Sequence, residues 1–308
     1  MKRLIAAAVA ATLSSFHASA EDASCARVRS ADMGWTDIVL TTTTAGLVLK
    51  AMGYEMSNTL LGLNVAYESL KTGQIDIFLG NWRPAQDIEF KAYFDKNWVD
   101  VVTTNLEGAK YTLAVPTYVA DAGVRSFDDL ARFPDRFYKK IYGIEPGTNQ
   151  PLLDMVAAGR HGLKDWEIVE SSEQGMLAQV RRSIERKEWV VFLGWQPHPM
   201  NLDYDITYLA GGDQEFGPNF GGSTVRTLSR PGYAAACPNL ARFFRNLTFD
   251  VAYENRGMKM IVDDGMEAPA AALALLKAHP EKLEAWLDGV TTHDGQPALP
   301  AVRAALAQ

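Results

Sequence analysis

Two segments of this chain share one pattern. Residues 75–84 read IDIFLGNWRP and residues 190–197 read VVFLGWQP, so each joins a short apolar run to glycine, tryptophan and proline. A short, unbroken apolar run bounded by Gly and Pro is typical of a parallel strand covered on both faces. Ligands in open α/β sheets gather at the carboxyl ends of such strands. We therefore expect Trp82 and Trp195 to lie at strand ends, on the two sides of a ligand cleft.

Strand and helix patterns alternate around each segment. Before the first tryptophan, the sequence predicts strands over 25–30, 54–59 and 75–79, with helices over 38–52 and 64–72 between them. Strands over 140–144, 166–170 and 189–193 repeat this order, and Ser172 can cap a helix between the last two. The chain is therefore predicted to be an α/β protein with two lobes, each a mostly parallel sheet flanked by helices.

The chain is expected to cross between the lobes twice. The stretch 101–115 is extended, with few helix signals, and 204–211 resembles a return connection. Lobe one would then comprise residues 21–110 and 206–308, and lobe two residues 111–205. The part after Ala234 is expected to be largely helical and to belong to lobe one.

The first twenty residues fit a cleavable secretory signal. Lys2 and Arg3 precede an apolar stretch, and Ala18-Ser19-Ala20 predicts cleavage after Ala20, so we expect residues 1–20 to be a signal peptide and the mature protein to be periplasmic. Removal of the two basic residues lowers the formal charge from -7 to about -9, which makes nucleic acid a poor partner. The residues before Cys25 lack the pattern of a lipid-modified cysteine, so no lipid anchor is expected.

The chain has two cysteines, Cys25 and Cys237. An even count in an exported protein indicates one disulfide first, and two buried free thiols are the alternative. A bond would tie the beginning of the mature chain to its late part, so that both parts belong to one lobe.

Four aromatic residues fall at predicted strand ends or crossovers: Trp35, Trp82, Tyr111 and Trp195. Any one of them alone could simply fill the core. Together, rings offered from two lobes suggest a cleft for a cation, because the face of an aromatic ring carries negative charge density. A quaternary ammonium has no N–H group to donate, so ring faces are its natural receptor.

Several motifs also resemble a known family. Residues 34–37 (GWTD), 78–84 (FLGNWRP), 105–116 (NLEGAKYTLAVP) and 192–199 (FLGWQPHP) are similar to the glycine betaine/choline substrate-binding proteins of bacterial ABC transporters. The resemblance spans the mature chain and implies a two-lobed periplasmic binding protein fold of type II. It implies an aromatic box around choline formed by Trp35, Trp82, Tyr111 and Trp195, contacts to the choline hydroxyl from Asp37 and Asn149, and delivery to a membrane permease. A monomer without cofactor or metal is expected.

Asp37 favours choline over glycine betaine. Its carboxylate would attract a net cation and repel the carboxylate of betaine. Each polar candidate also has a plainer interpretation: Asp37 as an acid at a helix N-terminus, and Asn149 as a cap before Pro151.

Other functions stay open. Glycine betaine, acetylcholine or another quaternary ammonium compound could occupy the same box. A choline-ester hydrolase is a more remote alternative, because an aromatic cage could also serve catalysis. The sequence shows no Gly-x-Ser-x-Gly elbow, no His-Glu-x-x-His motif and no phosphate loop, so we expect a binding protein rather than an enzyme.

Overall fold

The computed structural model describes residues 23–307, and in that range one sheet of nine strands forms the centre of the molecule. Its order is β2-β1-β3-β9-β4-β7-β5-β6, with β8 also paired to β4. The strands are β1 (Arg27–Asp32), β2 (Glu55–Leu60), β3 (Ile77–Arg83), β4 (Asp100–Pro116), β5 (Lys140–Tyr142), β6 (Glu167–Val169), β7 (Phe192–Gln196), β8 (Ile206–Tyr208) and β9 (Gly222–Ser229).

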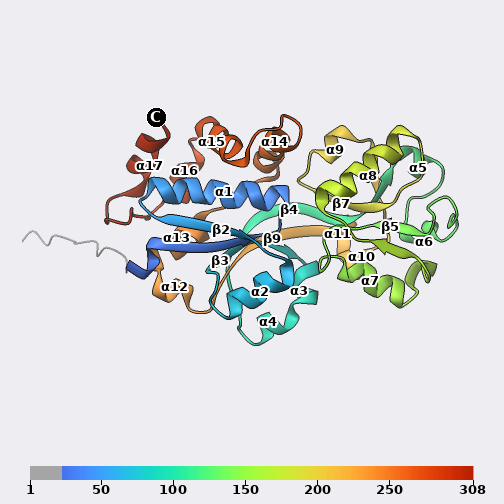
Figure 1. The fold of residues 1–308 in the computed structure, drawn as a ribbon, viewed down its shortest axis with the longest axis horizontal. Coiled ribbons are helices and arrows are strands. Elements are labelled where there is room, and N and C mark those ends of the chain that lie inside the picture. The colour runs from blue at the N-terminus through green and yellow to red at the C-terminus, as the bar shows by residue number, and fades with distance from the viewer. Residues whose placement is uncertain (1–22, 308) are drawn as a thin grey trace, which may run out of the picture.

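The sheet consists of two parallel groups joined by antiparallel strands. Strands β2, β1 and β3 are parallel to one another, as are β6, β5 and β7. The long strands β4 and β9 pair with each other, β9 with β3 and β4 with β7, all antiparallel. We call the part built on β1–β3 the first half and the part built on β5–β8 the second half; β4 and β9 run between them (Figure 1). The predicted α/β fold with mostly parallel groups is confirmed.

Helices cover both faces of the first half. In Figure 1, α1, α14, α15 and α17 lie on one face of the sheet, and α2, α3, α4 and α12 lie on the other. The helices of this half are α1 (Thr36–Ala51), α2 (Leu63–Lys71), α3 (Ala85–Glu89), α4 (Lys91–Asp95), α12 (Tyr233–Ala236), α13 (Pro238–Asn246), α14 (Val251–Val262), α15 (Ala268–Ala278), α16 (Lys282–Trp286) and α17 (Ala298–Leu306). The largely helical end expected after Ala234 is confirmed.

The second half has shorter elements. Its helices are α5 (Thr117–Asp121), α6 (Phe127–Leu130), α7 (Gln150–Ala157), α8 (Glu173–Glu185), α9 (Met200–Asp203), α10 (Asp213–Phe216) and α11 (Pro218–Gly221), with the 3-10 turn η2 (Arg160–Gly162). A second 3-10 turn, η1 (Ala23–Ala26), precedes β1 in the first half. The predicted cap of α8 is present, since the Ser172 hydroxyl accepts a hydrogen bond of 3.0 Å from the Gly175 amide.

The strands that carry the two tryptophans extend further than predicted. The sequence pattern ended them at residues 79 and 193, whereas β3 runs to Arg83 and β7 to Gln196. The reason is pairing to the connecting strands: Trp82 lies opposite Val225 of β9, and Trp195 lies opposite Tyr111 of β4. Both tryptophans therefore lie within ordered strands, close to their ends rather than beyond them.

The predicted disulfide is confirmed. Cys25 and Cys237 are bonded, with their Cα atoms 5.7 Å apart, and both side chains are buried. The bond connects η1 to the residue before α13, so the beginning and the late part of the chain belong to the first half. The alternative of two free thiols is wrong.

Two other predictions concern the signal peptide and the boundaries of the two lobes. The signal peptide at residues 1–20 lies outside the described residues. Among residues 23–307, no helix combines the length and hydropathy needed to cross a bilayer. The lobe boundaries stay predictions, although β8 pairs with the end of β4 at Ala114–Pro116 and α10 contacts α7, which places residues 206–216 beside the second half.

Candidate functional site

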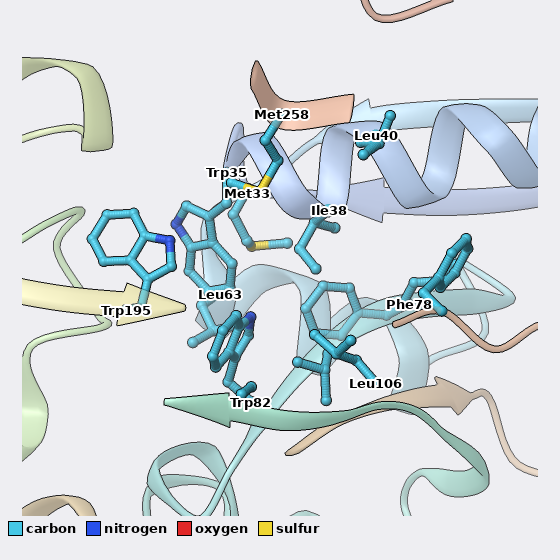
Figure 2. Close-up of a cluster of buried hydrophobic side chains, with 14 of the residues drawn as sticks. Met33, Trp35, Ile38, Leu40, Leu63, Phe78, Trp82, Leu106, Trp195 and Met258 are labelled. Carbon is cyan, nitrogen blue, oxygen red and sulfur yellow. The ribbon is translucent and has the colours of Figure 1, made fainter. Parts of the chain in front are cut away.

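A cavity between the two halves is lined by the four rings singled out in the sequence. Trp35 comes from the residue before α1, Trp82 from β3, Tyr111 from β4 and Trp195 from β7. Figure 2 shows the three indoles converging from separate elements. The cavity is also lined by Asp37, Leu63, Ala85, Gln86, Glu89, Ile144 and Thr148. The three tryptophans are at most 8% exposed, so their faces are available mainly to whatever fills the cavity.

Strand register and two glycines place the rings. Trp195 and Tyr111 lie opposite each other in the β7–β4 ladder, and the centroids of the Trp82 and Tyr111 rings are 6.2 Å apart. A Cβ added at Gly80 would lie 2.8 Å from the Phe78 ring, and one at Gly194 would lie 3.0 Å from both Ala114 and Tyr208. The Gly in each repeated segment therefore permits the close packing that holds the neighbouring tryptophan.

Asp37 reaches the cavity from the first turn of α1. Its carboxylate is 2% exposed and accepts a hydrogen bond of 3.1 Å from the Trp82 indole N–H. Burial, and secondly the charge of Glu173, raise the pKa of Asp37 to about 7, although backbone amides of the helix start oppose the shift. Asp37 is therefore both a helix N-terminal acid and a cavity residue, and the two interpretations coexist.

Glu89 is a second cavity acid, and the sequence analysis missed it. Its carboxylate has no hydrogen bond or ion pair within residues 23–307, and burial, followed by the charge of Asp154, raises its pKa to about 7. One sequence signal could have found it: Ala85 and Glu89 are four residues apart in the short helix after Pro84, so they share a face. Without a structure, nothing indicated that this face is turned to the ligand cleft.

Asn149 is not brought to the cavity. Its side-chain oxygen accepts from the Ile144 amide at 2.9 Å, and its NH₂ group donates to the Ile144 carbonyl and the Glu170 carboxylate, both at 2.9 Å. These bonds use both N–H groups within the loop. Asn149 does occupy the N-cap position of α7, before Pro151, but its side chain makes no capping hydrogen bond there. Its neighbour Thr148 lines the cavity instead.

The charges around the cavity have one sign. Two carboxylates line it, and no Lys, Arg or His of the described chain does. Residues 23–307 also contain no cluster of three His, Cys, Asp or Glu side chains that could hold a metal. Aromatic faces beside unbalanced carboxylates form a receptor for an organic cation.

Comparison with known proteins agrees with this chemistry. Residues 26–278 match the family model for the substrate-binding domain of ABC-type glycine betaine transport systems. The chain belongs to this family. The predicted family is thus confirmed, and with it the type II periplasmic binding protein fold. Substrate-binding proteins of ABC importers act in the periplasm or outside the cell.

Three solved relatives cover most of the chain. An ABC-transporter choline-binding protein in complex with choline is 49% identical, with a TM-score of 0.91 over 93% of this chain and 100% of that one. The unliganded, semi-closed form of an ABC-transporter choline-binding protein, also 49% identical, gives 0.85 over 92% of this chain and 100% of that one. Lactococcal OpuAC, closed on glycine betaine, is 26% identical, with a TM-score of 0.75 over 84% of this chain and 98% of that one. The present arrangement is thus nearer the choline-bound form than the semi-closed form.

Proposed function

We propose that this protein is the choline receptor of an ABC importer. Trp35, Trp82, Tyr111 and Trp195 surround the trimethylammonium group, and closure of the two halves completes the box before the ligand passes to the permease. The observation that carries the proposal is the cavity itself, with four rings and two carboxylates and no basic residue along its described wall. The likeness to a relative solved with choline supports it.

The energetics suffice for a tight complex. A desolvated cation–π contact contributes about 2 kcal/mol, and a micromolar complex needs about 8 kcal/mol in total. Several rings can therefore supply most of the affinity, less the cost of ordering and closure. The choline hydroxyl is a donor, and the carboxylate of Asp37 or Glu89 can accept a hydrogen bond from it.

Glycine betaine is the second candidate, because the family model and the lactococcal relative both carry its name. It shares the ammonium head but adds a carboxylate, for which the described wall offers no cation. The amide of Gln86 is neutral and one of its N–H groups already donates to the Gly80 carbonyl, so it cannot balance the charge of that carboxylate. Acetylcholine, which lacks a carboxylate, is electrostatically acceptable.

The remaining features of the proposal concern location and partners. We propose export by the signal peptide at residues 1–20, action in the periplasm as a monomer without a lipid anchor, and delivery to a cognate permease. The two lobes would be residues 21–110 with 206–308, and residues 111–205. The protein would need no cofactor and leave its ligand unchanged.

Calorimetric titration of the refolded, ligand-free protein tests the proposal, with tryptophan fluorescence as a parallel report of closure. Micromolar binding of choline with much weaker binding of betaine supports it. Preference for betaine would retain the aromatic box but overturn the charge argument, and failure to bind either ligand would overturn the function. Cleavage of acetylcholine by the pure protein would instead support the hydrolase alternative.

A further inference from the structure

The start of α1 is connected to the second half by hydrogen bonds from Trp35 and Thr36. Glu173, the first residue of α8, accepts from the Thr36 hydroxyl at 2.5 Å and from the Thr36 amide at 3.2 Å. Glu145, in the loop after β5, accepts from the Trp35 indole N–H at 2.9 Å. The cavity residues Trp35 and Asp37 flank Thr36, so these bonds act directly on the part of α1 that faces the ligand.

The two acceptors also belong to one network. The Glu145 carboxylate accepts from the Glu173 amide at 2.9 Å. His198 lies 3.3 Å from the Glu173 carboxylate, and its other ring nitrogen accepts from the Met200 amide at 3.0 Å. That amide fixes the proton of the neutral ring on the nitrogen that faces Glu173, which therefore receives a third donor. Residues of the second half thus fix the positions of both the Glu145 and the Glu173 carboxylates.

Burial shows what the network separates. Glu173 and His198 are each 1% exposed and Thr36 is 5% exposed. None of the three lines the ligand cavity; all three line a second crevice, between α8, α9 and the end of α14. The network therefore forms a wall between the ligand cavity and a crevice that also runs between the two halves.

We propose that Glu145 and Glu173 are positioning residues that latch the first turn of α1 onto the second half. The inference rests on the proposed function. The donors belong to the first half and the acceptors to the second, so separation of the halves breaks every bond of Trp35 and Thr36 to these carboxylates. In the closed form, the latch sets the orientation of the Trp35 ring and closes the wall behind it. The latch slows ligand dissociation rather than speeding association, because its hydrogen bonds form after the ligand has entered.

Thr36→Val tests the latch, because it removes the hydroxyl donor and keeps the shape of the side chain. We expect the choline dissociation rate, measured by stopped-flow tryptophan fluorescence, to rise about tenfold, as for loss of one hydrogen bond to a charged group. The association rate should stay within about twofold, as expected when an interaction forms only after encounter. Thr36→Ser restores a hydroxyl and should restore slow release.

A matched control lies on the same helix. Thr41 is buried, and its hydroxyl donates to the Ile38 carbonyl within α1 at 3.3 Å, so Thr41→Val makes the same chemical change without touching the second half. Equal effects of Thr36→Val and Thr41→Val, or an unchanged dissociation rate in Thr36→Val, would overturn the latch. If the wild type binds betaine and not choline, the proposed function fails, and the same series measured with betaine still decides the latch. Binding of neither would overturn both.

Discussion

The two walls of the cavity differ in charge. The first half contributes two indoles together with the carboxylates of Asp37 and Glu89, whereas the second half contributes Trp195, Ile144 and Thr148, which are neutral. Tyr111 stands on β4, the strand that connects the halves. Because rings stand on both sides, full cation–π contact requires closure, but the two carboxylates that line the cavity stand on one side. An open first half can therefore attract a cation before the second half covers it.

The two tryptophans of the repeated segments differ in the same way. The Trp82 indole N–H donates to Asp37, whereas the Trp195 indole makes no hydrogen bond within residues 23–307 and packs edge-on against His198, with ring centroids 5.1 Å apart. Trp82 thus connects a ring face to the cavity charge, and Trp195 offers a face alone. The repeated sequence pattern does not distinguish these roles.

Truncation of the two rings should expose this difference most strongly. Trp82→Ala is expected to weaken choline binding by about 3 kcal/mol, because it removes a cation–π contact of about 2 kcal/mol and also removes the indole donor to the buried Asp37 carboxylate. Trp195→Ala should cost about 2 kcal/mol, from the ring alone. Calorimetry on both variants measures the difference. Equal losses would show that the Trp82–Asp37 bond adds nothing to the ring, and wild-type affinity in both would remove the cavity as the binding site.

Charge selection by the first half can be tested at Asp37. Asp37→Asn keeps an oxygen for the Trp82 indole and removes the charge, so choline should lose about 2 kcal/mol, within the range for loss of one partner of a buried charge pair. Betaine should lose much less, because its own carboxylate is no longer repelled. Titration of both ligands against wild type and variant gives the ratio. An equal loss for the two ligands would contradict the charge argument.

The sequence predicted the parts of this site that depend on local pattern. Trp82 and Trp195 were found because Gly, Trp and Pro follow apolar strands, whereas Trp35 and Tyr111 were found at a predicted strand end and a crossover and through the family resemblance. The disulfide followed from a cysteine pair in an exported chain. Glu89, Glu145 and Glu173 were missed because their roles depend on which surfaces face each other across the halves, which no local pattern records. Asn149 illustrates the same limit, since the residue next to it in sequence turns toward the cavity while its amide closes the loop.

Acidic pH should weaken choline binding, because it protonates the Asp37 carboxylate that lines the cavity. The pKa of Asp37 is raised to about 7, mainly by burial, and a bound cation favours the carboxylate, so binding below this pH must release a proton. From pH 8 to pH 6, choline affinity should fall about tenfold for this one group. Calorimetry at the two pH values, in buffers of different ionisation enthalpy, gives both the affinity and the protons released.

The stability of the ligand-free protein should change with pH in the opposite direction. A folded carboxyl whose pKa exceeds its unfolded value binds more protons than the unfolded chain, so its contribution improves as pH falls from 7 toward 4. Glu254 adds to the same trend, since burial and then the charge of Asp37 raise its pKa. Thermal unfolding at pH 8 and pH 6 checks the sign. For the preceding prediction on affinity, Asp37→Asn is the control, because it should flatten the dependence of choline affinity on pH. If the variant kept the wild-type slope, a group other than Asp37 would cause the pH dependence.

The smallest effect is expected at Glu89, the acid of the first half that has no partner within the described chain. Its charge faces the cavity from α3, but it is only partly buried, so solvent screens its attraction for a cation. Glu89→Gln should weaken choline binding severalfold and leave the affinity for betaine unchanged or slightly higher. The preference for choline over betaine would then be smaller but still present. Glu55→Gln, at an exposed ion pair on β2, makes the same substitution away from the cavity and controls for net charge. If Glu89→Gln and Glu55→Gln change the choline-to-betaine ratio alike, selection depends on overall charge; if only Glu89→Gln changes it, the charged wall extends from α1 to α3.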